Sequence, residues 1–288
     1  VVARGIAATA MHLESHPEDK KDIVGVAGHS AGEYNAIDLA DVTSTRGTTR
    51  LVRARSEALG KVSEIGSRSS GLVAVTMRVR EGNSPTEEQV QMYGEVVDEL
   101  IHKHPRNSPR YLSTVNTPFQ KTVGLRAKDI DGVVKKYEER KSQGILVSRV
   151  PVAFAFHTPF ADPAVEWFRK LRQEYGVDLE DLQDPRIPVI SNVDGSLLCT
   201  KEDIDREMYE QLVKPVMFLA GMLAAKVELG FNETIELGVE EDRHGLVTSM
   251  QQATFPGGIT QVVSKAAHEA LGAAIMFGKR YIHPSHDK

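Results

Sequence analysis

Apolar residues in the first quarter of the chain form short continuous runs that alternate with segments of helical spacing. The run "IVGVAG" at 23–28 ends in glycine and is typical of a strand buried in a parallel sheet. Residues 1–16, 31–40 and 48–62 instead place apolar side chains three or four positions apart, as amphipathic helices do. The polar stretch "GSRSSG" at 66–71 then indicates a boundary between structural units.

Residues 71–150 have a different order of elements. The pattern predicts, in turn, a strand, a helix, two strands, a helix and a strand, at 71–79, 86–104, 110–117, 121–126, 127–144 and 145–152. This β-α-β-β-α-β order is that of the ferredoxin-like unit. We therefore expect residues 71–150 to form a small ferredoxin-like subdomain inserted into a larger one.

From residue 151 onward, strands and helices alternate again. Helices are predicted at 163–175, at 206–230 (one or two around Pro215) and at 265–281, and strands at 187–193, 233–238 and 259–264. Such alternation predicts an α/β fold with a mostly parallel sheet flanked by helices. We expect residues 1–70 and 151–288 to form this large subdomain together.

Composition limits the classes of partner and the compartment. With 288 residues, 41% hydrophobic and 26% charged, the chain is typical of globular proteins. Its net charge of −5 and its lack of a basic block argue against nucleic acid as a partner, and no apolar run is long enough to cross a membrane. A single cysteine, Cys199, excludes an internal disulfide and fits a cytoplasmic protein.

A candidate nucleophile lies directly after the strand predicted at 23–28. Gly28-His29-Ser30-Ala31-Gly32 fits G-x-S-x-G, the pattern of a serine exposed at a strand-to-helix turn. The backbone N–H of Ala31 would then be placed to bind an oxyanion. The simpler alternative is that Ser30 only caps the following helix.

Serine requires a neighbouring base, and His157 is the best placed of ten histidines. It ends the apolar run "VPVAFAFH" and should emerge at a strand terminus, where functional groups of α/β sheets gather. A buried histidine satisfied by the backbone is the alternative. His102 and His104 form an H-x-H pair without acidic or cysteine ligands nearby in sequence, so we expect no metal site.

Several motifs together resemble one family, the malonyl-CoA:acyl carrier protein transacylases and the related acyltransferase domains of fatty-acid and polyketide synthases. "GHSAGE" at 28–33 matches the family's GHSxGE, and "AFHTPF" matches its histidine motif. Arg55 lies twenty-five residues after Ser30, as the family's arginine does. The segments "VNTPFQ", "VISNVDG" and "YEQLVKPVMF" also match in order, so the likeness covers nearly the whole chain.

The resemblance implies a fold with an α/β-hydrolase-like core and a mechanism by way of an acyl-serine. Ser30 would take a malonyl group from malonyl-CoA with His157 as base, and pass it to the phosphopantetheine thiol of an acyl carrier protein. No bound cofactor is implied. Backbone carbonyls near Gln211 would orient His157 in place of an aspartate. The substrate-binding residues implied are Arg55, His29, Gln211, Asn116 and Phe156.

Two of these residues have a physical purpose that can be stated. A guanidinium such as that of Arg55 can bind the malonyl carboxylate through two hydrogen bonds, whereas lysine offers only a point charge. The ring of Phe156 would crowd an α-methyl branch, which favours malonyl over methylmalonyl. One methyl group is worth only about 1–3 kcal/mol in a pocket, and Ala31 leaves extra room beside the nucleophile.

The sequence departs from the family pattern at two places. No F-x-G-Q-G loop, which completes the family's oxyanion hole, precedes Ser30, so we expect an N-terminal part of the core to be missing upstream of Val1. At "ELGVEEDRHGLV", residues 236–247, the family's E-x-G-P is not kept beyond Gly238.

Three other functions compete with acyl transfer. A patatin-like lipase would use a Ser-Asp dyad, which Asp194 in "VDG" could supply, and an acyl-thioester hydrolase would share Ser30 and His157. A degenerate acyltransferase-like scaffold would need none of these residues.

The basic residues Lys135, Lys136, Arg140 and Lys141 could meet an acidic carrier protein or be an ordinary solvated surface. The sequence leaves open whether the chain acts alone or within a larger synthase.

Overall fold

The computed structural model describes residues 22–66, 70–78, 85–104, 108–231, 233–237, 259–263 and 274–278. The helix predicted at 1–16 and the departure after Gly238 lie outside these residues. Within them, no helix is both long enough and apolar enough to span a bilayer.

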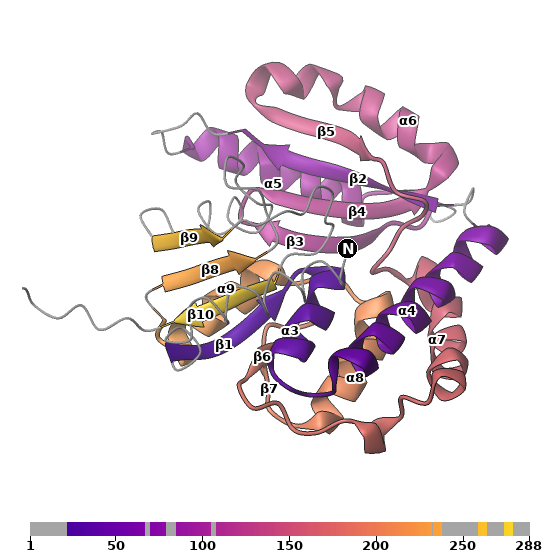
Figure 1. The fold of residues 1–288 in the computed structure, drawn as a ribbon. Coiled ribbons are helices and arrows are strands. Elements are labelled where there is room, and N and C mark those ends of the chain that lie inside the picture. The colour runs from indigo at the N-terminus through magenta and orange to yellow at the C-terminus, as the bar shows by residue number, and fades with distance from the viewer. Residues whose placement is uncertain are drawn as a thin grey trace, which may run out of the picture.

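The first of two sheets contains the strand that precedes Ser30 (Figure 1). Its six strands follow the order β7-β6-β1-β10-β8-β9. They are β1 (Ile23–Gly28), β6 (Val189–Ile190), β7 (Leu197–Leu198), β8 (Glu233–Leu237), β9 (Ile259–Val263) and β10 (Ala274–Gly278). The α/β fold class predicted from the sequence is confirmed.

Two details of this prediction are wrong. The sheet is mixed rather than mostly parallel, because β1–β6 and β8–β9 pair in parallel while β1–β10, β10–β8 and β6–β7 are antiparallel. Two of these three antiparallel pairs involve β10. This strand lies where a helix was predicted at 265–281. A short apolar run such as "AIMFG" fits a helix or a strand equally well by periodicity, and here pairing with β1 and β8 decides.

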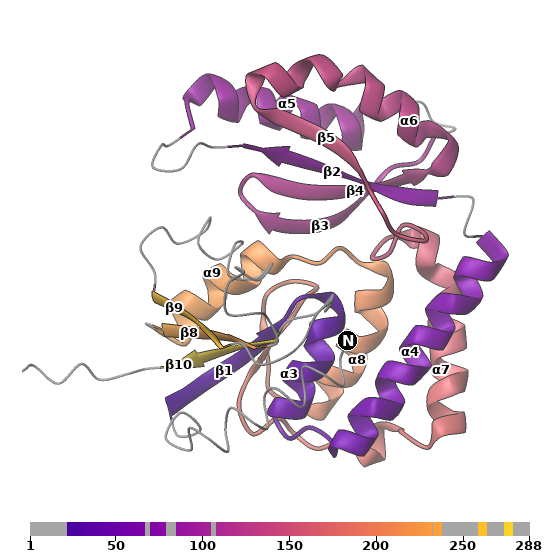
Figure 2. The ribbon, with the colours of Figure 1, turned by 45° about the horizontal axis from the view of Figure 1, so that its top comes forward.

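Helices cover this sheet and supply most of its core. They are α3 (Glu33–Leu39), α4 (Thr45–Gly66), α7 (Asp162–Tyr175), α8 (Lys201–Val213) and α9 (Phe218–Glu228), with 3-10 turns η1 (Ser30–Gly32), η3 (Pro159–Ala161) and η4 (Leu179–Asp181). Helices α4 and α7 run side by side (Figure 2). Tyr34 on α3, Leu51 on α4 and Phe168 on α7 are almost completely buried in one apolar cluster.

The second sheet is built from residues 70–150 and has the order β3-β4-β2-β5. Its elements are β2 (Ser70–Met77), α5 (Glu87–His102), β3 (Tyr111–Thr117), β4 (Gln120–Arg126), α6 (Ala127–Lys136), η2 (Glu138–Gln143) and β5 (Ile145–Val150). All three strand pairs are antiparallel, and Figure 2 shows α5 and α6 on the face of the sheet that points away from β1. The β-α-β-β-α-β sequence is therefore folded in the ferredoxin-like order.

Strand β3 of the four-stranded sheet is hydrogen-bonded to the segment between α8 and α9. The backbone N–H of Val115 in β3 donates to the carbonyl of Val216 (2.8 Å), and the N–H of Val216 donates to the carbonyl of Ser113 (2.8 Å). This short parallel bridge lies just before α9. It fixes β3 close to the carboxyl end of α8, which contains Gln211.

Candidate active site

Ser30 lies in the tight turn between β1 and α3. Its φ of 54° is in the left-handed region, which non-glycine residues rarely adopt. The turn is so tight that a Cβ on Gly28 would lie 2.1 Å from the carbonyl carbon of Gly32. The chain thus places Ser30 on a strained strand-to-helix turn, as the G-x-S-x-G pattern predicted.

His157 faces Ser30, although 127 positions separate them in sequence. The serine Oγ lies 2.7 Å from Nε2 of the imidazole, and Nδ1 lies 2.6 Å from the backbone carbonyl oxygen of Gln211. Because a carbonyl can only accept, Nδ1 carries the proton and donates it to Gln211. Nε2 is then free to accept the hydroxyl proton of Ser30, which is the arrangement that activates a serine nucleophile.

Burial keeps this imidazole neutral. The side chain is 5% exposed, and desolvation, followed by the nearby charge of Arg55, lowers the pKa of His157 to about 3. A neutral imidazole can take up a proton at physiological pH, as a general base must. An anion bound at Arg55 would offset the positive charge and raise the pKa of this base toward the working range.

The position of His157 in the fold differs from the prediction. Strand β5 ends at Val150, so the histidine does not emerge at a strand terminus but lies in the irregular segment that follows. Pro151 has no backbone N–H with which to continue the strand pairing. Farther along this segment, the backbone N–H of Phe156 donates to the carbonyl of Phe154 at 3.1 Å. The backbone reaches His157 with a φ of 57°, which makes it the second left-handed residue of the site.

Arg55 extends from α4 to the same serine. Its Nη2 lies 3.3 Å from Oγ of Ser30, and the residue is 9% exposed. The Nε atom is buried without a hydrogen-bond partner, and desolvation lowers the pKa of the guanidinium. Two positions earlier on the helix, the exposed Arg53 pairs with Glu57 at 2.9 Å. Only Arg55 therefore brings its charge into the site.

The other predicted residues lie around this centre. Nε2 of His29 is 2.9 Å from Oδ1 of Asn116 in β3, which links the turn beside Ser30 to the small sheet. The imidazole of His29 also packs edge-on against Phe218, and its burial lowers the pKa. Phe156 packs against Phe154, with ring centroids 4.3 Å apart and ring planes tilted by 50°. Ala31, directly after Ser30, is partly buried in η1.

Three polar residues of the site had no role in the sequence-based prediction. Oδ1 of Asn192 accepts the backbone N–H of Ser30 at 2.8 Å, and the buried carboxyl groups of Glu33 and Glu207 both reach Asn192. The segment "VISNVDG" that contains Asn192 matches the family, and so does Glu33 in "GHSAGE". No pattern in the sequence singled out Glu207.

Within the described part of the chain, Asp194 makes no hydrogen bond to Ser30. Its Oδ1 accepts the backbone N–H of Ser196 at 2.9 Å, within its own turn. Ser30 instead has His157 as its partner. Among the described residues, no group of three or more histidine, cysteine, aspartate or glutamate side chains could hold a metal ion.

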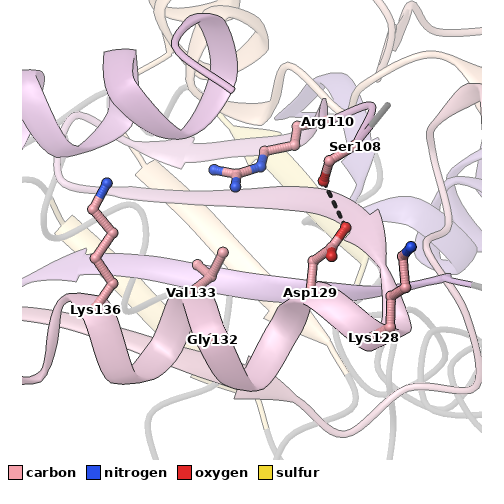
Figure 3. Close-up of a pocket in the computed structure, with 7 residues that line it drawn as sticks. All are labelled: Ser108, Arg110, Lys128, Asp129, Gly132, Val133 and Lys136. Carbon is pink, nitrogen blue, oxygen red and sulfur yellow. Dashed lines mark hydrogen bonds between the residues drawn. The ribbon is translucent and has the colours of Figure 1, made fainter. Parts of the chain in front are cut away.

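A pocket of about 360 Å³ lies elsewhere, beside α6 (Figure 3). It is lined by Ser108, Arg110, Lys128, Asp129, Gly132, Val133 and Lys136. Oγ of Ser108 donates to the carboxylate of Asp129 at 2.6 Å, so this acid is already satisfied within the pocket. The lining contains neither Ser30 nor His157, but it includes Lys136, one of the four basic residues considered above as a contact for the carrier protein.

Comparisons with known proteins agree with the motifs, although no family model matches the chain. A malonyl CoA-acyl carrier protein transacylase of Bacillus subtilis is 26% identical over 226 residues, which are 78% of this chain and 64% of that protein. A non-reducing polyketide synthase of Pseudevernia furfuracea is 28% identical over 80% of this chain, which corresponds to 10% of the synthase. This chain therefore spans less than two thirds of either relative.

Solved structures show the same fold. The structure of a malonyl-transacylase in complex with its type II polyketide synthase acyl-carrier protein matches with a TM-score of 0.69 and 19% identity, over 92% of this chain and 77% of that one. The resemblance that the motifs indicated is thereby confirmed. The homologues and structural neighbours of this chain are malonyl-CoA:acyl carrier protein transacylases and acyltransferase domains of polyketide synthases.

Proposed function

We propose that this protein is an acyltransferase that moves a malonyl group from malonyl-CoA to the phosphopantetheine thiol of an acyl carrier protein. The observation that carries the proposal is that the side chains of His157 and Arg55 both contact the hydroxyl oxygen of Ser30. Oγ of Ser30 lies 2.7 Å from Nε2 of His157 and 3.3 Å from Nη2 of Arg55. A nucleophile, a neutral base and a buried cation are therefore within reach of one bound acyl group.

The reaction would proceed in two half-reactions. Oγ of Ser30 attacks the thioester carbonyl as its proton passes to Nε2 of His157, and the thiolate of CoA leaves with that proton. The carrier thiol then gives its proton to Nε2 and attacks the acyl-serine, and Ser30 regains a proton as it leaves. The backbone N–H of Ala31 would stabilise the oxyanion in both steps.

Arg55 supports a substrate that carries a carboxylate. Among the described residues, no aspartate or glutamate forms an ion pair with this arginine, although it is buried. A buried charge without a counter-ion is costly, and a bound malonyl carboxylate would supply one. A neutral acyl chain would leave the guanidinium unpaired, so a lipid ester is a poor candidate. His29, Gln211, Asn116 and Phe156 would shape the rest of this pocket.

We further propose an organisation that suits this chemistry. Residues 1–70 and 151–288 would form the catalytic subdomain, and residues 71–150 the small one, with substrate bound between them. The acidic carrier protein would dock on the basic residues of α6 and η2, namely Lys135, Lys136, Arg140 and Lys141. The structural neighbour described above is a malonyl-transacylase in complex with its acyl-carrier protein. The protein would work in the cytoplasm, with malonyl-CoA as a substrate and no bound cofactor.

An acyl-thioester hydrolase is the second candidate, since it would use the same serine and histidine and differ only in the acceptor. The buried, unpaired Arg55 favours a malonyl thioester for both enzymes. The patatin-like alternative has less support, because Asp194 bonds to its own turn and not to the nucleophile. Release of free malonate in the presence of carrier protein would identify the hydrolase.

The decisive test is the mass of the intact protein after incubation with malonyl-CoA. We expect the wild type to gain one malonyl group and to lose it when holo acyl carrier protein is added. Ser30→Ala should gain nothing, and His157→Ala should acylate at least 100-fold more slowly, as loss of a general base predicts. An unmodified wild type, or equal labelling of Ser30→Ala, would refute the proposal.

A further inference from the structure

Two buried carboxyl groups lie directly behind the serine turn. Glu33 begins α3 and is 1% exposed, and Glu207 in α8 is 4% exposed. Both accept the same backbone N–H of Asn192, at 3.2 Å for Oε1 of Glu33 and 2.8 Å for Oε1 of Glu207. Because they share a donor, the two carboxyl groups are immediate neighbours. The reaction proposed above uses neither of them.

On one side, this pair holds the nucleophile through Asn192. Oε1 of Glu33 accepts Nδ2 of that asparagine at 2.8 Å. The same Nδ2 donates to the carbonyl of Gly28 at 2.7 Å, and Oδ1 accepts the N–H of Ser30 at 2.8 Å. One side chain therefore binds the backbone on both sides of the strained turn. Its own orientation is set by the carboxyl pair.

On the other side, the pair holds the base through Gln211. The amide Nε2 of Gln211 donates to Oε2 of Glu33 and to the carbonyl of Ser30, the latter at 3.1 Å. The backbone carbonyl of the same Gln211 accepts Nδ1 of His157 at 2.6 Å. The side chain and the backbone of one residue thus connect Glu33 to both catalytic candidates.

We propose that Glu33 and Glu207 act as one positioning unit that keeps the Ser30 nucleophile and the His157 base aligned with each other. Glu207 anchors this unit, since its carboxylate also accepts the N–H of Val193 at 3.0 Å and the hydroxyl of Ser191 at 2.9 Å. The inference deepens the proposed acyl transfer and rests on it for the roles of Ser30 and His157.

The pair holds a single shared proton. Two carboxylates in contact cannot both be ionised when they are buried. Burial, and then the charge of Glu207, hold the pKa of Glu33 well above its usual range. Burial also raises the pKa of Glu207, but hydrogen bonds from Ser191 and from Glu33 oppose this. Both carboxyl groups are therefore harder to ionise than a glutamate in water.

Each isosteric amide variant should therefore disturb the alignment. Glu33→Gln keeps an acceptor for Asn192 but turns Oε2, which accepts from Nε2 of Gln211, into a donor. Glu207→Gln replaces one of the two oxygens that accept from Ser191, Asn192 and Val193 with a donor. Each variant should slow the acylation of Ser30 by about 10- to 100-fold with little change in KM, because the reacting groups lose their alignment.

The test compares both variants by two readouts. The first is the rate at which a fluorophosphonate phosphonylates Ser30, in which the serine oxygen displaces fluoride and His157 takes the serine proton. The second is the rate of malonyl transfer to holo carrier protein. Labelling depends on the alignment of Ser30 and His157 but not on the malonyl group. If Ser30 is labelled but malonyl is never transferred, the proposed substrate is wrong and the labelling rates still decide the inference.

Asp205→Asn provides the control on the same helix. Asp205 pairs with the buried guanidinium of Arg172 at 2.6 Å, away from the serine turn. This variant should lower the thermal midpoint of unfolding without changing the labelling rate of the folded protein. The inference is supported if Glu33→Gln and Glu207→Gln both slow labelling by about 10-fold or more and Asp205→Asn does not. It is overturned if either glutamate variant labels at the wild-type rate, or if Asp205→Asn slows labelling as much as they do.

Discussion

The candidate site joins side chains from distant parts of the sequence at the hydroxyl of Ser30. His157 comes from the irregular segment after β5, and Arg55 from the middle of α4. Sequence motifs were sufficient to name these three residues. The proton positions were not predictable, because they depend on the carbonyl of Gln211 lying 2.6 Å from Nδ1 of His157, a contact made only in the folded protein.

The role of Arg55 leads to a prediction about substrate choice. Arg55→Lys replaces a two-pronged donor by a point charge and should lower kcat/KM for malonyl-CoA by about 10- to 100-fold, because the bidentate contact with the carboxylate is lost. Arg55→Ala should lower it further while acetyl-CoA, which has no carboxylate, reacts as fast as or faster than with wild type. Steady-state kinetics with both thioesters measure the ratio.

A matched control for this prediction is Arg53→Ala. Arg53 lies on the same helix, pairs with Glu57 on the exposed surface and does not reach Ser30. Removing it should leave both rates within about 2-fold, since exposed ion pairs contribute little. Equal losses for the two thioesters in Arg55→Lys would show that this residue does not recognise the carboxylate.

At the scale of elements, the site depends on how closely β1 and α3 approach each other. Gly28 ends the strand, and its α-carbon lies against the backbone of Gly32 and Glu33 at the start of the helix. The strand, the turn and the helix were all predicted from the sequence, because each has a strong local pattern. The helix predicted at 265–281 was wrong at β10, where pairing with distant strands outweighed the local pattern.

The tight approach predicts that Gly28→Ala is strongly destabilising. The new methyl group would lie 2.1 Å from Gly32 and 2.4 Å from the backbone nitrogen of Glu33, and neither is a flexible side chain. We expect a loss of about 3 kcal/mol or more in the free energy of unfolding, measured by urea denaturation, because the turn must open.

Gly60→Ala is the control, since it makes the same substitution inside α4. Apart from its chain neighbours and the backbone of its own helix, no atom lies within 4 Å of a Cβ built at this position. Alanine also favours a helix interior over glycine, so this variant should gain about 0.5–1 kcal/mol. A Gly28→Ala protein as stable as wild type would mean that the turn is less tight than the structure indicates.

At the scale of the whole molecule, the two sheets contribute to one site. The β3 bridge to Val216 brings Asn116 next to His29, although 87 positions separate these residues. The sequence predicted the order of strands in the small sheet, since that order follows from local patterns. It could not predict this bridge, because isolated backbone hydrogen bonds between distant segments leave no periodic signal. We expect such contacts to set the width of the substrate site.

Stability is also a property of the whole molecule, and the buried imidazole of His157 makes it depend on pH. In the unfolded chain the pKa is near 6.5, and in the folded protein it is about 3. Below pH 6.5 the unfolded state therefore binds a proton at this histidine, whereas the folded state does not. Stability from this group is fully present above pH 6.5 and is lost progressively toward pH 3. Burial of His29 acts in the same direction.

We expect His157 alone to cost about 1 kcal/mol of unfolding free energy between pH 7.5 and pH 5.5. His157→Gln removes the titrating group, so urea denaturation at the two pH values should show a smaller loss than in wild type. His102→Gln, at the exposed end of α5, should keep the wild-type difference. If His157→Gln lost as much stability as wild type, the folded protein would bind this proton as readily as the unfolded chain, and burial would not lower the pKa of His157.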